Sequence, residues 1–173
     1  MSSILKVDTI QNTSGTTALT INSDGRVLQP AKPAWRLGMT NNHVISTSGG
    51  SGTTINFSSS SSSRFDFIQG GCTVSSGEVT VPVAGVYQVN MTLRINGVGS
   101  GYIIGRITRN GDVDTTKEMY VINGSPDGTY DNLTGSDCFL CSANDTLRVQ
   151  VATQSDSDYN VGMDSQFSGF LVG

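Results

Sequence analysis

The sequence predicts an all-β protein, and three observations support that prediction. Apolar and polar residues alternate along most segments suited to regular structure, which is the two-residue period of a half-buried strand. The strong helix formers Ala, Leu, Glu and Lys are scarce, whereas 21 of the 173 residues are glycine. Polar turn sequences recur between the alternating segments. About nine or ten short strands are therefore expected, which suits a β-sandwich.

The first 33 residues differ in texture from the rest of the chain. Their apolar residues form three short alternations, which we expect to be strands joined by the turns QNTSG and NSDG: Leu5 and Val7, Leu19 and Ile21, and Val27. Pro30 and Pro33 predict a stiff, extended linker. So small a segment cannot bury a core alone, so it must pack against copies of itself or anchor to something larger. Residues 1–33 are thus a predicted anchor and linker, and residues 34–173 a predicted head.

Strand candidates recur through the head, separated by polar turns. They cover residues 35–39, 54–57, 65–74, 79–96, 102–108, 117–122, 137–141, 147–152 and 167–172. No helical periodicity alternates with them, so a parallel α/β sheet is not expected. With 36% apolar residues, the chain is long enough to bury one core.

The segment 79–96, VTVPVAGVYQVNMTLRIN, is the clearest of these candidates. Eight apolar residues, from Val79 to Ile95, fall on odd positions, and polar residues such as Gln88 and Arg94 fall between them, so one face meets a core. Pro82 and Gly85 interrupt the pattern without changing its phase. Because proline cannot donate to a strand ladder and an interior glycine weakens one, the segment is predicted to be two strands joined by a turn or sharp bend.

Charge and hydropathy exclude several classes of partner. The net charge of −4 comes without a basic stripe, so nucleic acid is not an expected partner. No segment approaches the roughly 20 apolar residues that span a bilayer, and the N-terminus lacks the apolar run of a signal peptide. We therefore expect a chain that is made in the cytosol and does not insert into a membrane.

The three cysteines do not form a disulfide framework, because their number is odd and their spacing irregular. Cys138 and Cys141 have the spacing of a redox or zinc pair, but a second pair is missing, and residues three apart on a strand point to opposite faces. All three, Cys72 included, are predicted to be buried free thiols.

Catalytic motifs are sparse. The one histidine, His43, is expected to be an exposed polar residue in a loop or an edge strand, and no G-x-S-x-G nucleophile motif is present. Paired carboxylates could support glycosidic cleavage, but nearly all the aspartates fall in predicted turns, where aspartate is favoured for its local hydrogen bonds. We therefore predict no enzyme activity, with a polysaccharide depolymerase as the enzymatic alternative.

One polar segment, QSDSDYN at 154–160, could contact a ligand. Its carboxylates and amides suit calcium, although one loop supplies too few of the six to eight oxygen ligands that calcium takes. Alternatively, the tyrosine ring could stack on a sugar while the polar groups bind its hydroxyls. A solvated loop is the simpler interpretation, and no metal or cofactor is predicted. The residues retained as a candidate receptor-contact loop are Asp156, Asp158, Tyr159 and Asn160.

Pro82, Gly85, Tyr87 and Val89 resemble the Pro-x-x-Gly-x-Tyr-x-Phe signature of C1q-like heads, which share a jelly roll with tumour necrosis factor. Val89 departs from the signature, which has phenylalanine there. Residues 135–151, followed by SQFSGFLVG near the end of the chain, are similar to the last two strands of that family. The resemblance covers residues 34–173.

The resemblance implies a jelly-roll head that assembles as a homotrimer. Tyr87, Phe167 and Leu171 would then lie in the core or near the trimer seam, with Phe170 on the opposite face of the last strand. The family's collagen stalk is absent, so its immune role does not carry over.

The N-terminal segment, LKVDTIQNTSG and then LTINSDGRVLQPAKPAW, instead resembles fibre and appendage proteins of marine tailed phages. Together these features predict a non-enzymatic, homotrimeric tail or capsid fibre. Its head would bind a host-surface glycan or protein, and its N-terminal segment would bind other virion proteins. The chain would be assembled into the virion in the host cytoplasm. The structural alternative is a stabilising knob without a receptor.

Overall fold

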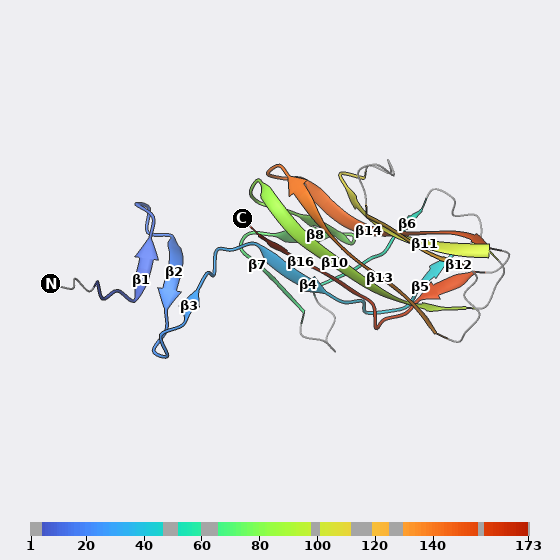
Figure 1. Cartoon of the computed structure of the whole chain (residues 1–173), viewed down its shortest axis with the longest axis horizontal. Helices are drawn as coiled ribbons and strands as arrows, with labels where there is room; N and C mark the ends of the chain where they lie inside the picture. The colour runs from blue at the N-terminus through green and yellow to red at the C-terminus, as the bar shows by residue number, and fades with distance from the viewer. Residues whose placement is uncertain are drawn as a thin grey trace.

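The computed structural model describes residues 5–46, 52–59, 66–97, 101–111, 119–124, 130–155 and 158–172. Within these ranges all regular secondary structure is β, and no helix occurs. The described strands form three antiparallel sheets, of which one small sheet stands at the N-terminal end and two form the head (Figure 1). The prediction of an all-β, sandwich-like protein is confirmed.

The N-terminal sheet, which we call the foot, contains three short strands. They are β1 (Thr9–Gln11), β2 (Thr17–Ile21) and β3 (Val27–Leu28). Asn12 closes the first turn, because its Oδ1 accepts hydrogen bonds from the backbone N–H groups of Ser14 and Thr16. The sequence placed the first strand at Leu5 and Val7, and this is wrong: the turn at Asn12 fixes the strand to the residues directly before it.

The neck between foot and head is a turn and not the predicted extended linker. The Lys32 N–H donates to the Gln29 carbonyl at 3.0 Å, which puts Pro30 at the second position of a β-turn. Pro33 is buried, and its carbonyl accepts a hydrogen bond from the Leu171 N–H at 2.9 Å. Proline favours that turn position as readily as an extended linker, so the sequence alone did not separate the two.

The first head sheet is built around β10, its longest strand. β10 pairs with β13 along one edge and with β16 and then β15 along the other, and three further strands extend the sheet. Its members are β4 (Ala34–Leu37), β5 (His43–Ile45), β7 (Phe67–Gln69), β10 (Gly85–Asn96), β13 (Asp131–Cys141), β15 (Tyr159–Val161) and β16 (Gln166–Leu171).

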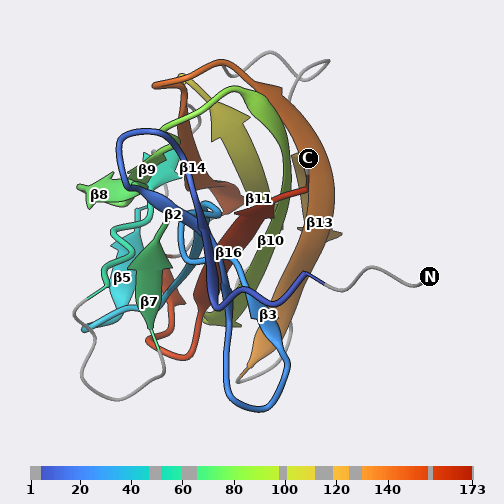
Figure 2. The ribbon, with the colours of Figure 1, turned by 90° about the vertical axis from the view of Figure 1, so that its left-hand side faces the viewer.

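The second head sheet is ordered β12-β11-β14-β9-β8, with β6 also paired to β14. Its members are β6 (Thr53–Thr54), β8 (Thr73–Ser75), β9 (Glu78–Thr80), β11 (Gly101–Arg109), β12 (Met119–Gly124) and β14 (Thr146–Ser155). Figure 2, viewed from the N-terminal side, shows the head strands around a common interior with the foot in front.

The interruption in segment 79–96 is a crossing between the two sheets. β9 belongs to the second head sheet and β10 to the first, so the chain leaves one layer after Thr80 and enters the other at Gly85. Pro82 lies in this crossing, where no ladder hydrogen bond is lost. Val79 and Tyr87, on either side of it, are both fully buried. The two predicted strands are confirmed, and the phase is kept because both sheets face the same interior.

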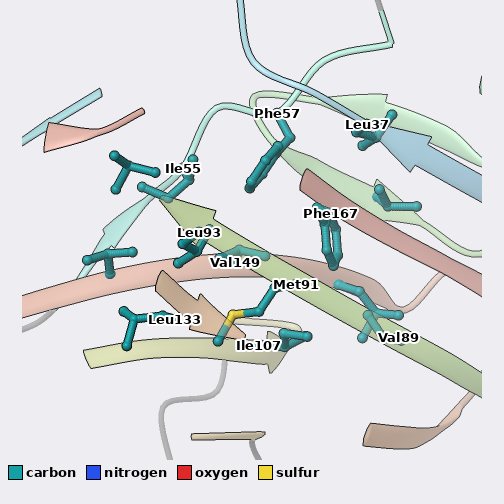
Figure 3. Close-up of a cluster of buried hydrophobic side chains, with 14 of the residues drawn as sticks. Leu37, Ile55, Phe57, Val89, Met91, Leu93, Ile107, Leu133, Val149 and Phe167 are labelled. Atoms are coloured by element: carbon teal, nitrogen blue, oxygen red, sulfur yellow. The ribbon is translucent and has the colours of Figure 1, made fainter. Parts of the chain in front are cut away.

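The core fills the space between the two head sheets (Figure 3). Phe167 lies at its centre, with ring centroids 5.8 Å from those of both Trp35 and Phe57. The labelled aliphatic side chains come from both layers, for example Leu93 from β10 and Val149 from β14. Such a dry, two-sided core is the dominant stabilising feature of the head.

Two predicted head strands differ from the structure in length or number, and two strands of the structure were not predicted. Segment 65–74 contains β7 and β8, which are separated by Gly70 and Gly71 at positive φ. Segment 54–57 leaves the ladder after Ile55, whose N–H still bonds to the Val149 carbonyl, because the Phe57 N–H bonds to the Ile55 carbonyl instead. The missed strands, β5 and β15, are three residues long and show too few alternations to be recognised.

Candidate assembly surface

One face of the first head sheet points away from the core and is not covered by any other described sheet. Even-numbered residues of β10 lie on this outer face, because the odd-numbered ones are buried. The register places Leu140 beside Val86, and Cys138 and Phe170 on either side of Gln88. The outer face therefore consists of rows of side chains that cross neighbouring strands.

The row nearest the neck is apolar, and Phe170 extends it from the row of Gln88. We call Val86, Leu140, Phe170 and Val172 the base patch, and the Val172 N–H donates to the Val86 carbonyl at 2.7 Å. Leu140 is 69% exposed, Val172 52% and Phe170 44%. Contiguous exposed apolar side chains are unfavourable in water and are typical of protein–protein contacts.

The next rows are polar and connected. The Gln88 amide donates to the Ser136 hydroxyl at 2.7 Å, and that hydroxyl donates to the Asn90 Oδ1 at 2.7 Å. The Cys138 thiol donates to the Gln88 Oε1 at 3.1 Å. These bonds hold the side chains in fixed positions, so the middle of the outer face is ordered before anything contacts it.

Toward the far end the outer face carries charge and an aromatic ring. Arg94 forms an ion pair with Asp164, and its guanidinium carbon lies 4.9 Å from the centroid of the Tyr130 ring. The Arg94 N–H donates to the Ser165 hydroxyl at 3.0 Å. Arg94 thus fixes both the turn before β16 and the Tyr130 ring, which stays 60% exposed.

The strand register gathers many loop ends at the far end of the head, opposite the foot (Figure 1). Asn96 of β10 pairs with Asn160 of β15, and Gly101 of β11 pairs with Ser155 of β14. Ile95 of β10 pairs with Asp131 of β13. These strand ends lie at the end of the head that is opposite the foot.

The candidate receptor-contact residues do not form one exposed loop. Asp158 is exposed and Asn160 is half-buried, but Tyr159 is fully buried, and Asp156 lies outside the described residues. Tyr159 starts β15, where strand alternation turns it and Val161 into the core. Its ring is therefore not available to stack on a sugar, and this part of the prediction is corrected.

Of the four residues predicted as core or seam, two are core residues and Phe170 lies on the outer face. Tyr87 and Phe167 are fully buried within the single chain and are core residues. Leu171 is half-buried and packs against the core, whereas Phe170 lies on the outer face, as its opposite parity predicted. Burial raises the pKa of Tyr87 to about 12, and its hydroxyl donates to the Val83 carbonyl at 2.9 Å.

The three cysteine thiols differ in exposure. Cys72 and Cys141 are free and buried, and burial raises the pKa of each to about 11. Cys138 is free but exposed, so the expectation of a buried thiol is wrong there. The cause is strand alternation: three residues along β13, Cys138 and Cys141 lie on opposite faces.

His43 lies in β5 at the edge of the first head sheet, half-buried and paired with Val161. Burial lowers its pKa, so the imidazole is neutral at neutral pH. Within the ranges that the structure describes, no three His, Cys, Asp or Glu side chains are grouped to hold a metal ion. No helix there is long and apolar enough to cross a bilayer.

A groove of about 450 Å³ separates the foot from the base of the head. Leu19 lines it from the foot and Pro33 from the neck, while Val83, Leu171 and Val172 line it from the head. Val172 belongs to this groove and to the base patch, so the two apolar surfaces are continuous.

The sequence analysis missed the base patch and the Arg94–Tyr130 pair. A signal for the patch existed, since Phe139 and Cys141 share the inward phase and Leu140 must then point outward. The Arg94–Tyr130 pair had no local signal, because 36 residues separate its members in the chain.

Comparison of the sequence with models of known protein families gave no match, and comparison with curated proteins gave none either.

Proposed function

We propose that the chain is a non-enzymatic structural protein of a phage virion, in which three copies form a short appendage whose head attaches to the host surface. The observation that carries the proposal is the uncovered outer face, whose base patch is continuous with the groove beside a small foot in which none of the described residues 5–32 is buried. Both surfaces need a partner, and a symmetric homo-oligomer supplies it to both.

The order of the head strands supports a jelly roll, as the resemblance to C1q-like heads implies. Eight strands form two sets of four, β4-β16-β10-β13 in the first sheet and β9-β14-β11-β12 in the second. The chain alternates between the sheets at most of its connections. Two four-stranded sheets linked by such crossings are typical of jelly rolls.

The chemistry of the outer face supports its use as the seam of a trimer. Burying Leu140 and Phe170 against sister copies would remove exposed apolar surface from water. The ordered polar rows beside them can exchange hydrogen bonds across the seam with little loss of side-chain entropy. Tyr87 and Phe167 stay inside each head and contribute to the seam only by supporting it.

The assembly is tested by light scattering on the purified full-length chain. We expect a mass of about 55 kDa, three times the 18.2 kDa of one chain. The double variant Leu140→Asp, Phe170→Asp should give folded monomers, whereas Thr73→Asp, at an exposed position on β8 at the edge of the second head sheet, should stay trimeric. A wild-type monomer at micromolar concentration would refute the proposal.

Attachment would use the far end, where Tyr130 and Asp164 are exposed to a ligand and Arg94 holds the ring in place. Three weakly binding heads on one trimer can attach firmly through multivalency. Labelled trimer should bind susceptible cells and not resistant ones, and Tyr130→Ala should weaken binding more than Thr73→Ala, which changes an exposed residue on β8 of the second head sheet. Trimers that bind neither cell type would favour the stabilising knob. Release of reducing sugars from host envelopes would favour a depolymerase.

Anchoring is tested with the foot. Deleting residues 1–33 should leave the head folded and should prevent its incorporation into virions. Full occupancy of the truncated head on particles would show that the foot is not the anchor.

A further inference from the structure

The two faces of the foot differ sharply in chemistry. The register pairs Ile10 with Leu19 and Ile21 with Val27, so these four apolar side chains share one face. We call it the apolar foot face. The opposite face carries Thr9, Ala18, Thr20 and Leu28.

Within the part of the chain that the structure describes, no other sheet covers the apolar foot face, and only Leu19 lines the groove next to the head. No residue from 5 to 32 is buried, and Ile10 remains 46% exposed. The foot is a separate sheet, and Figure 1 shows its strands running across the long axis beyond the base of the head. Sheets this short are not stable in water unless one face is buried. The foot therefore requires another polypeptide.

Charge and continuity favour a second copy of this chain as that polypeptide. Residues 5–28 carry two cations, Lys6 and Arg26, and two anions, Asp8 and Asp24, so identical feet can meet without net repulsion. Leu19 of the apolar foot face and Ala18 of the opposite face both line the neck groove, which is continuous with the base patch. A copy seated on the base patch is thus next to the foot, and of its two faces the apolar one gains more from burial.

We propose that the feet of three copies close around the long axis with their apolar faces inward, so that Ile10, Leu19, Ile21 and Val27 of all three form one small shared core. This inference rests on the trimer of the proposed function. It adds that the foot is an assembly element in its own right, whose order depends on its sister copies, and that only its outer face is left for other virion proteins.

Val27 and Leu28 provide a matched test, because they are neighbours in β3, lie on opposite faces and are 57% and 49% exposed in the single chain. Val27→Cys and Leu28→Cys would each be made in the full-length chain with Cys138→Ser, which removes the exposed native thiol. We expect a maleimide to label Val27→Cys at least about tenfold more slowly than Leu28→Cys. Mild oxidation should cross-link Val27→Cys into dimers and leave Leu28→Cys uncross-linked.

The outcomes separate this inference from the proposed function. Equal labelling of the two thiols in a protein that is still a trimer refutes the shared core and leaves the trimeric head intact. Faster labelling of Val27→Cys refutes it too, since the other face would then be inside. A monomeric wild-type chain refutes both. If either variant is insoluble, Ile10→Cys and Thr9→Cys on β1 repeat the comparison with the same expected contrast.

Discussion

The head and the foot have the same alternating sequence pattern, but their apolar side chains differ in burial. In the head, Leu93 and its odd-numbered neighbours on β10 are fully buried, because a second sheet covers them. In the foot, Leu19 and Ile21 alternate just as regularly and remain partly exposed, because one small sheet has nothing above it. Alternation therefore predicts which face of a strand is apolar. Whether that face is buried within the chain depends on whether a second sheet packs against it.

The largest contrast between the two regions is expected in thiol reactivity. Cys141 should react with a maleimide only when the head unfolds, because it is buried and its raised pKa of about 11 keeps it protonated. A foot thiol introduced by Leu28→Cys should react at once, on the order of a thousandfold faster at pH 7. Mass spectrometry of timed samples measures both rates in one protein, with Cys138→Ser as background. Comparable rates would show that the head opens locally.

Matched leucine truncations should differ by several kcal/mol. Leu93→Ala leaves a cavity between the sheets and should lower the free energy of head unfolding by about 2–5 kcal/mol. Leu19→Ala removes a half-buried side chain from the separate foot sheet and should change the same quantity by less than about 0.5 kcal/mol. Urea unfolding followed by Trp35 fluorescence provides the comparison. Equal losses would mean that foot and head unfold as one unit.

A smaller effect is expected at Gly169, where the core leaves no room for a side chain. A Cβ there would lie 2.4 Å from the Trp35 ring. Gly169→Ala should therefore lower the unfolding free energy by roughly 1–3 kcal/mol and change the near-ultraviolet circular dichroism of Trp35. Ser168→Ala, on the opposite face of β16, is the control and should change stability by less than about 0.5 kcal/mol. An unperturbed Trp35 spectrum in Gly169→Ala would contradict the packing.

The smallest effect concerns a turn at the base of the head. Asp145 accepts hydrogen bonds from the Asn110 amide and the Ser142 N–H, each at 2.8 Å, and the Asn110 bond is the main cause of its lowered pKa. Because the folded-state pKa lies below the unfolded one, this stability is present at neutral pH and is lost as the pH falls through the folded-state pKa.

Asp145→Ala should therefore lower the free energy of unfolding by about 1 kcal/mol at pH 7, and by less as the pH falls below about 4. Unfolding curves at both pH values give the two differences, with Asp24→Ala, at an exposed position in the foot, as control. A difference that grows in acid would mean that the carboxylate destabilises the fold.

The sequence by itself determined the fold class, the break at Pro82 and the residues that share a strand face. These properties follow from side-chain alternation and backbone chemistry, which are local. Local rules also placed Phe170 on the face opposite Phe167, and they would have placed Leu140 outward had they been applied there.

Only the tertiary structure decided which faces are covered. It put Tyr159 into the core, left Cys138 in solvent and brought Arg94 beside Tyr130. It also joined the neck to the head through the hydrogen bond between the Leu171 N–H and the Pro33 carbonyl. The physical reason is that a side chain is buried only when a second surface packs against it. A strand's own sequence determines its two faces, but the residues that cover one of them come from distant parts of the chain.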